Sequence, residues 1–161
     1  MSESITYQQA MVLVERAYRA QMRGEITNAI ELYERSLEIF PTAEAHTYLG
    51  WAYSMMQRYD EAIEQCELAI IIDPAFGNPY NDIGAYLIEM GQENEAVPWL
   101  EEALTAARYD SPHFPLVNLG RVAESNGRYK QALAYYNQAL EREPLYRSAR
   151  LAKFTLLGKL N

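Results

Sequence analysis

The sequence predicts an all-α fold in which pairs of antiparallel helices stack in one direction as a solenoid. Two columns of small residues recur along the chain with the same spacings of 33, 34 and 36 residues. The first column holds Ala17, Gly50, Gly84 and Gly120. The second column holds Ala29, Ala62, Ala96 and Ala132. A period near 34 residues with small residues at fixed offsets is typical of helical repeat proteins. Small side chains let crossing helices approach each other closely.

Each repeat is predicted to contain two helices joined by a tight turn. The turn residues are Gly24, Gln57, Gly91 and Gly127. Glycine adopts the left-handed conformation that ends a helix at little cost. We therefore expect Gln57 to occupy a less favourable backbone conformation than the three glycines.

The second helix of each repeat is marked by apolar residues three and four positions apart, as in Ile30, Tyr33 and Leu37. These helices are predicted at residues 27–40, 60–72, 94–108 and 129–142. Because a proline disfavours helix in the residue before it, three of them end before Pro41, Pro74 and Pro144.

The third repeat departs from this pattern, because Arg108 stands where the proline is expected. Its connector carries the two additional residues of the 36-residue spacing. We predict either a longer helix or a bulged loop there. Pro98 lies early in the same helix, so we expect it to disturb the first turn at most.

A final amphipathic helix is predicted at about residues 147–159. Leu151, Phe154 and Leu157 are expected to form its apolar face, which would cap the last repeat. The alternative is a dimerisation or docking helix, because Leu156 and Leu160 add apolar surface.

The repeat resembles the tetratricopeptide repeat family. The best unit contains Tyr48-Leu49-Gly50-Trp51-Ala52-Tyr53, then Tyr59-Asp60-Glu61-Ala62-Ile63, then Asp73-Pro74. The fourth unit matches nearly as well, and the resemblance covers about residues 10–146. It implies a right-handed solenoid in one domain, residues 1–161. The implied units are about 10–42, 43–76, 77–112 and 113–146, followed by the capping helix.

In this family the first helix of each repeat lines a concave groove, so the resemblance implies a peptide-binding surface there. The candidate groove residues are Tyr18, Met22, Tyr48, Trp51, Met55, Asn81, Asn118 and Arg121. The aromatic and methionine side chains suit apolar ligand groups. The two asparagines have the donors and acceptors to hold a peptide backbone, and Arg121 suits a carboxylate. We expect Tyr18 and Trp51 to act as anchors. The alternative is that these side chains only pack against neighbouring repeats.

One ligand-binding mode of the family is not expected. Its chaperone-tail clamps hold a terminal carboxylate with basic residues along the first helices. The corresponding positions are Val14, Tyr18, Tyr48, Asn78 and Asp82. None of them is basic, and Asp82 would repel a carboxylate.

Composition narrows the function classes further. The net charge is −8, which argues against nucleic-acid binding. Residues 121–161 nevertheless carry a net charge of +5, so the rest of the chain is strongly acidic. This asymmetry is either an uneven solvated surface or a means of steering a partner or a second copy. No apolar run approaches the ~20 residues that span a bilayer, and the first residues do not have the pattern of a signal peptide. We expect a cytoplasmic protein.

Residues suited to catalysis or metal binding are sparse. Cys66 is the single cysteine and is predicted to be a buried filler. His46 and His113 lack acidic or cysteine partners at metal-ligand spacing, and we expect both to be structural. We therefore expect no enzyme activity, metal or cofactor. The leading function is a protein-interaction adaptor. The alternatives are a self-assembling module that pairs its acidic body with its basic end, and a small export chaperone.

Overall fold

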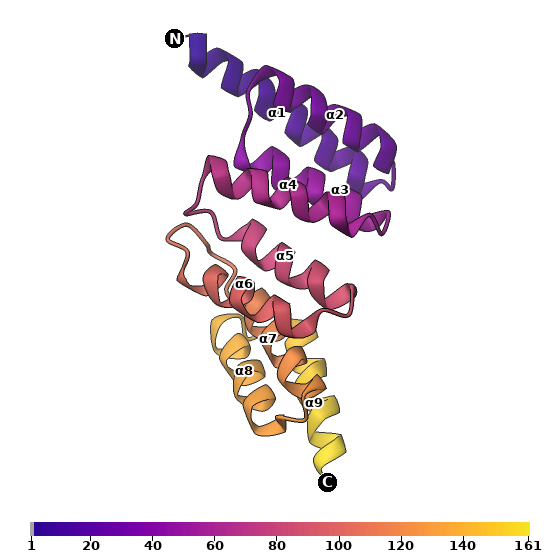
Figure 1. The fold of residues 1–161 in the computed structure, drawn as a ribbon, viewed down its shortest axis with the longest axis vertical. Coiled ribbons are helices and arrows are strands. Elements are labelled where there is room, and N and C mark those ends of the chain that lie inside the picture. The colour runs from indigo at the N-terminus through magenta and orange to yellow at the C-terminus, as the bar shows by residue number, and fades with distance from the viewer. Residues whose placement is uncertain (1) are drawn as a thin grey trace.

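The computed structural model describes residues 2–161, with side chains from residue 5 onward, and this part of the chain folds as nine α-helices. The helices, shown in Figure 1, are α1 (Ser2–Met22), α2 (Ile26–Ile39), α3 (Ala43–Met55), α4 (Tyr59–Ile72), α5 (Asn78–Glu89), α6 (Glu93–Thr105), α7 (His113–Ser125), α8 (Tyr129–Arg142) and α9 (Arg147–Leu160). The predicted second helices agree within one residue in three repeats. The predicted end of the second helix in the third repeat, residue 108, was wrong, because α6 stops at Thr105.

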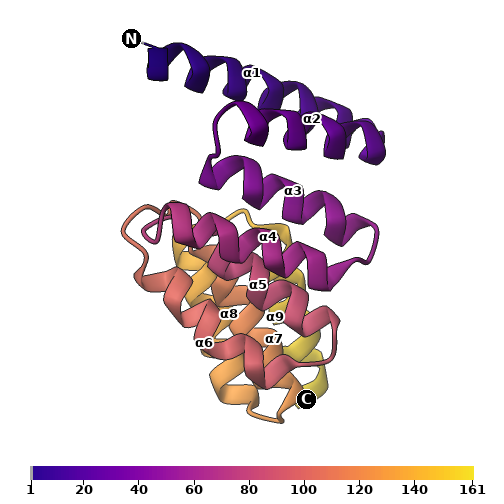
Figure 2. The same ribbon diagram turned by 45° about the horizontal axis from the view of Figure 1, so that its top comes forward.

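The helices form four antiparallel pairs that succeed one another from the N-terminus to the C-terminus as a right-handed solenoid (Figures 1 and 2). The odd-numbered helices α1, α3, α5 and α7 also contact one another from pair to pair. The even-numbered helices contact each other less, so they spread apart on the outside of the curve. The odd-numbered helices therefore form the inner, concave layer, where the predicted groove residues lie.

The turn between the helices of each pair has the predicted left-handed residue. The φ angles are 83° at Gly24, 78° at Gly91 and 72° at Gly127. Gln57 occupies the same conformation with a φ of 60°, although it has a side chain. The expectation of a less favourable backbone at this turn is confirmed.

The small-residue columns lie where the two helices of a pair cross. A β-carbon added to Gly120 would meet the ring of Tyr136 at 2.3 Å, and one added to Gly84 would meet Leu100 at 2.4 Å. At Gly50 the nearest atom is the backbone oxygen of Ala62, 2.9 Å away. These crossings therefore tolerate no larger side chain without repacking.

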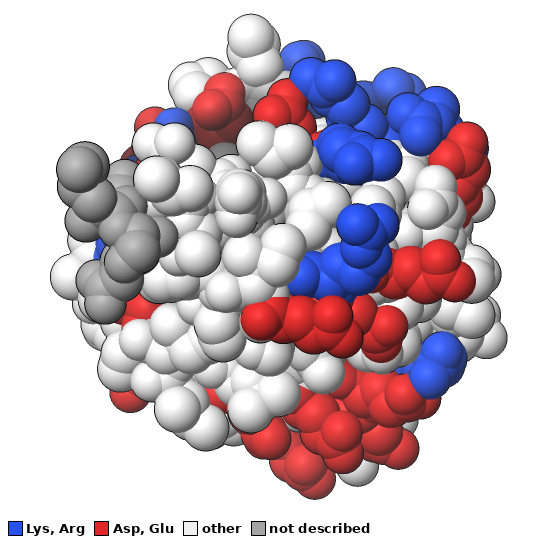
Figure 3. Space-filling view, turned by 90° about the horizontal axis from the view of Figure 1, so that it is seen from above, with Lys and Arg blue, Asp and Glu red and all other residues white. Residues whose placement is uncertain are grey.

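Charged side chains are unevenly distributed on the surface. Figure 3, a view from the N-terminal end, shows most visible basic groups on one side and most visible acidic groups on the opposite side. A broad uncharged area adjoins both. The charges visible on this face are therefore unevenly distributed across it.

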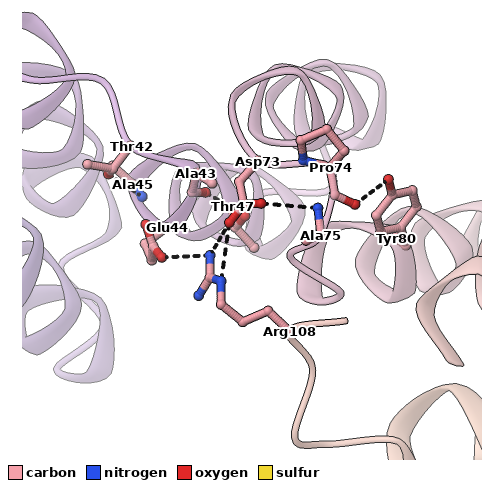
Figure 4. Close-up of polar contacts among 10 residues, drawn as sticks. All are labelled: Thr42, Ala43, Glu44, Ala45, Thr47, Asp73, Pro74, Ala75, Tyr80 and Arg108. Atoms are coloured by element: carbon pink, nitrogen blue, oxygen red, sulfur yellow. Dashed lines mark hydrogen bonds and ion pairs between the residues drawn. The ribbon is translucent and has the colours of Figure 1, made fainter. Parts of the chain in front are cut away.

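The connection from α6 to α7 is a loop that folds back on the preceding connection, from α4 to α5. Arg108 exchanges backbone hydrogen bonds there, donating to Ala75 O at 2.9 Å and accepting from Gly77 N at 3.1 Å. Its guanidinium pairs with Asp73 at 2.7 Å and with Glu44 at 3.1 Å (Figure 4). The residue that replaces the expected proline therefore ties the third repeat to α3.

The C-terminal helix packs differently from the prediction. Ala149 and Leu156 are the buried residues of α9 and join the core around α7 and α8. Leu151 and Phe154 are 65% and 64% exposed, so the predicted apolar face was wrong. The spacing of seven residues between Ala149 and Leu156 brings both onto the side that meets α8, and Leu151 and Phe154 lie on another side of the helix.

Candidate functional site

Three predicted groove residues form one aromatic cluster on the concave layer. The ring of Tyr18 on α1 lies 5.6 Å from that of Tyr48 and 6.3 Å from that of Trp51, both on α3. Tyr33 of α2 stacks on Tyr48 from the core side, with ring centroids 6.1 Å apart. Such pairs hold aromatic rings in defined orientations. Tyr18 remains 39% exposed, so the cluster offers a rigid apolar surface to a ligand.

The two predicted methionines are more exposed than the rings. Met22 is 53% exposed and Met55 is 47% exposed. The buried amide of Gln21 donates to the sulfur of Met55 at 3.2 Å and accepts from the hydroxyl of Tyr33 at 2.9 Å. This chain of contacts links α1, α2 and α3 beneath the groove surface.

The two predicted asparagines are brought together and buried. Asn118 Nδ2 on α7 donates to Asn81 Oδ1 on α5 at 3.1 Å. Only 8% of Asn81 and 9% of Asn118 remains exposed. Buried polar groups normally find partners of this kind. The pair is thus engaged within the protein, and its role in holding a peptide backbone stays a prediction.

A hollow of about 330 Å³ lies between α3, α5 and α7 on the concave layer. Four of the predicted residues line it, namely Trp51, Met55, Asn118 and Arg121. The other lining residues are Ser54, Tyr59, Asp82, Ala85, Tyr86, Ile88 and Glu89. Asp82 was also placed along the first helices in the comparison with the carboxylate clamps. Tyr86 was missed, although its position one helical turn after Asp82 was a usable signal.

The electrostatics of the hollow centre on Asp82, which is half-buried. Burial raises the pKa of its carboxyl to about 7, and a hydrogen bond from Asn81 acts in the opposite direction. Tyr86 is buried beside it, and its hydroxyl has no hydrogen-bond partner among the described residues. Burial also raises the pKa of Tyr86 strongly. The lining of the hollow therefore combines a half-buried acid with a buried hydroxyl group.

Among the described residues, no group of three or more histidine, cysteine or acidic side chains converges as a metal site. His46 donates to Gln65 at 2.7 Å, and His113 packs on the rings of Phe114 and Tyr146. Cys66 is fully buried, as predicted, and burial raises the pKa of its thiol. None of the helices from residue 2 to 161 has the length and hydropathy to cross a bilayer.

Comparison with known sequences identifies the repeat. Two family models described as tetratricopeptide repeat match residues 43–76 and 77–142, together more than half of the chain. A small glutamine-rich tetratricopeptide repeat-containing protein 2 of Mycosarcoma maydis is 34% identical over 70 residues, covering 43% of this chain and 20% of that protein. Human tetratricopeptide repeat protein 29 is 25% identical over 151 residues, covering 88% and 29%. The chain thus spans less than a third of these relatives.

Solved structures share the arrangement of helices. PilF of Pseudomonas aeruginosa superposes with a TM-score of 0.86 at 25% identity, covering 95% of this chain and 70% of that one. PilW, a type IV pilus biogenesis factor, gives a TM-score of 0.81 at 22% identity, covering 88% and 66%. The second TPR of Spaghetti (RPAP3), bound to the HSP90 peptide SRMEEVD, gives 0.60 at 26% identity, covering 66% and 99%.

Proposed function

Because the chain belongs to the tetratricopeptide repeat family, we propose that it is a non-enzymatic adaptor that binds a peptide or protein segment on its concave layer. A structural relative in the same family was solved with a bound peptide, which supports this class of function. The proposed surface consists of the aromatic cluster (Tyr18, Tyr48 and Trp51) and the hollow between α3, α5 and α7.

The observation that carries the proposal is the position of Trp51. Its ring lies beside Tyr18 in the aromatic cluster, and it also lines the hollow. The two features are therefore adjacent and form one surface across α1, α3, α5 and α7. Exposed aromatic and methionine side chains next to a concave site are typical of surfaces that bind other chains.

The ligand of this surface differs in kind from that of a carboxylate clamp. The half-buried ionisable group of the hollow is Asp82, an acid, whereas a carboxylate ligand needs cationic partners. Arg121 is present but exposed at the rim. The proposed adaptor therefore does not depend on an acidic chain terminus, although some of its relatives are named as co-chaperones.

A selection from displayed random 12-residue peptides tests the proposal. The full chain should enrich peptides whose affinity falls at least tenfold in a Tyr18→Ala/Trp51→Ala variant. Ile71→Ala is the matched control, because Ile71 is 76% exposed on α4, in the outer layer. Trp99→Phe would leave Trp51 as the sole tryptophan, so that its fluorescence reports binding. Absence of any enriched peptide, or equal binding by the double variant, would contradict the proposal.

Self-assembly is a second candidate, favoured by the surface of α9. Leu151 and Phe154 are exposed there beside basic side chains, and residues 121–161 carry a net charge of +5 in a chain whose net charge is −8. Association driven by opposite charges weakens as salt screens them. Sedimentation at 50 mM and 500 mM salt should therefore show a salt-sensitive dimer if this candidate is correct. A monomer at both concentrations would exclude it.

A further inference from the structure

The hollow between α3, α5 and α7 contains an acid without a counter-ion. Asp82 forms no ion pair among the described residues. A hydrogen bond from Asn81 reaches it, and Asn81 in turn accepts from Asn118. The asparagine pair therefore lies next to the carboxyl within α5 and α7. A half-buried carboxylate without a cation has lost part of its hydration, and a cation supplied by a ligand offsets that cost.

The groups around Asp82 do not supply this cation. The ionisable groups that interact with it are Tyr48 of α3, Cys66 of α4, Tyr86 of α5 and Tyr109 of the α6–α7 loop. Burial raises the pKa of each of these four groups, so all are neutral at pH 7. No histidine lines the hollow.

Two further charged side chains lie at the rim of the hollow. Glu89 and Arg121 are both exposed, and their charges are opposite. Because both are solvated, their influence on the interior is screened. Asp82 therefore sets the charge of the more buried part of the hollow.

Part of the wall of the hollow is apolar. Trp51 and Met55 contribute from α3, and Ile88 contributes from α5. A volume of about 330 Å³ is at the lower end of the range for ligand pockets, so it suits one or two side chains. A long basic side chain matches this arrangement, because its methylene stem packs on apolar surface while its charged end reaches a polar group. An indole face also attracts cations.

We propose that the hollow binds a lysine or arginine side chain of the ligand segment, with its stem against Trp51, Met55 and Ile88 and its charged end on the Asp82 carboxylate. The inference rests on the proposed function and specifies the ligand chemistry of that same site. According to this proposal the groove prefers a basic ligand side chain, whereas a carboxylate clamp prefers an acidic chain terminus.

The proposal has a consequence for the dependence of binding on pH. Burial raises the pKa of Asp82 to about 7 in the unbound chain. A cation on the carboxylate favours its ionised form and lowers that pKa. Binding therefore releases a proton near pH 7, and affinity for a basic segment increases from pH 6 to pH 8.

The first experiment is the random-peptide selection, carried out at pH 8 on the unmodified chain and on Asp82→Asn. The unmodified chain should enrich peptides with a lysine or arginine at a fixed position, and Asp82→Asn should lose that preference. Enriched peptides without a fixed basic residue would overturn this inference and leave the proposed adaptor intact. Absence of enrichment would overturn both.

The second experiment compares one enriched lysine peptide with its norleucine analogue, which keeps the stem and removes the charge. Calorimetry should show a loss of roughly ten- to hundredfold in affinity for the unmodified chain and little difference for Asp82→Asn. Glu89→Gln is the matched control, since it removes a solvated carboxylate from the same hollow and should lose no more than about twofold.

Proton release provides a readout that needs no variant. The lysine peptide should release about half a proton per complex at pH 7, because an unbound carboxyl with a pKa of about 7 is half protonated there; binding enthalpies in phosphate and Tris buffers measure this release. The norleucine peptide should release none. Equal affinities of the two peptides for the unmodified chain, or no proton release with the lysine peptide, would overturn the assignment of Asp82.

Discussion

The side-chain amide of Asn118 on α7 donates a hydrogen bond of 3.1 Å to the amide oxygen of Asn81 on α5. This bond joins two successive first helices beneath the concave surface, and Asn81 directly precedes Asp82 in α5. Both asparagines are nearly inaccessible to solvent. A ligand backbone would therefore have to compete with a bond that already exists. The pair lies next to the carboxyl that we assign to ligand binding.

The asparagine pair should contribute to stability. Asn118→Ala leaves the buried amide of Asn81 without its donor, which should cost about 1–3 kcal/mol in the free energy of unfolding. Urea denaturation measures this cost. Asn126→Ala is the matched control, because Asn126 donates to Asn94 at 2.9 Å on an exposed surface. Its effect should stay below about 0.5 kcal/mol, and equal losses would contradict the argument from burial.

Gly120 should resist substitution even by alanine. The added β-carbon would lie 2.3 Å from the ring of Tyr136, which is 1% exposed and donates to Glu124 at 3.1 Å. Because this ring has little freedom to move, Gly120→Ala should destabilise the chain by about 1–3 kcal/mol. Gly158→Ala meets no atom within 4 Å on α9 and should stabilise by up to about 1 kcal/mol. Thermal unfolding that fails to separate the two variants would count against the close crossing.

Replacing Gln57 with glycine should stabilise the fold. It has a φ of 60° in the turn between α3 and α4, where the other turns have glycine. Gln57→Gly removes the steric cost of this conformation and should stabilise by about 0.5–1 kcal/mol, after the added freedom of the unfolded chain is subtracted. The reverse change, Gly91→Gln, should destabilise by a similar amount. Melting temperatures that move in the same direction for both variants would disprove the reasoning.

Arg108 should contribute modestly to the free energy of unfolding, by an amount that depends on the salt concentration. Arg108→Ala removes the ion pairs to Asp73 and Glu44, which are partly exposed, so we expect a loss of about 0.5–1 kcal/mol. The hydrogen bond from Arg108 lowers the pKa of Asp73. The stability that this lowered pKa of Asp73 contributes is fully present above the pKa of Asp73 in the unfolded chain. It disappears as the pH falls through the lower pKa of the folded state. The melting temperatures of the unmodified chain and Arg108→Ala should therefore differ more at pH 7 than at pH 3. They should also differ more at 20 mM than at 500 mM salt.

Asp82 should make the unbound chain less stable as pH rises. Its pKa is raised from 3.8 to about 7, so the folded state holds a proton that the unfolded state releases between these values. Its contribution to stability therefore falls from pH 4 to pH 7 and stays constant above pH 7. Asp82→Asn should be nearly neutral at pH 4 and stabilising by up to about 4 kcal/mol at pH 8. Urea denaturation of the unmodified chain and Asp82→Asn from pH 4 to pH 8 measures this difference in the free energy of unfolding. Glu89→Gln is the control and should show no such dependence on pH.

The helix pairs were predictable because their signals are local. The small-residue columns, the turn residues and the apolar spacing within each helix are all read over a few residues. The structure confirms the pairs, the positive φ at Gln57 and the burial of Cys66. The end of α6 was not predictable in the same way. Residues after Thr105 leave the helix and pair with the α4–α5 connection, about 30 residues earlier in the chain.

The candidate site was predictable only as a set of positions on the concave layer. Helical spacing and the family pattern placed Tyr18, Tyr48 and Trp51 there, and the structure brings their rings together. The pairing of Asn118 with Asn81 depends on the offset between α5 and α7, which no single repeat encodes. The same offset determines how deeply Asp82 lies and which side chains surround it.

By itself, the sequence determined the repeated helix pair, since backbone preference and apolar spacing act within one unit. The tertiary structure alone decided which side-chain amides hydrogen-bond to each other, which acid has no cation as a partner, and which face of α9 is covered. These properties depend on distances between side chains of different repeats. The way one helix pair lies on the next therefore decides which of these side chains come within hydrogen-bonding distance.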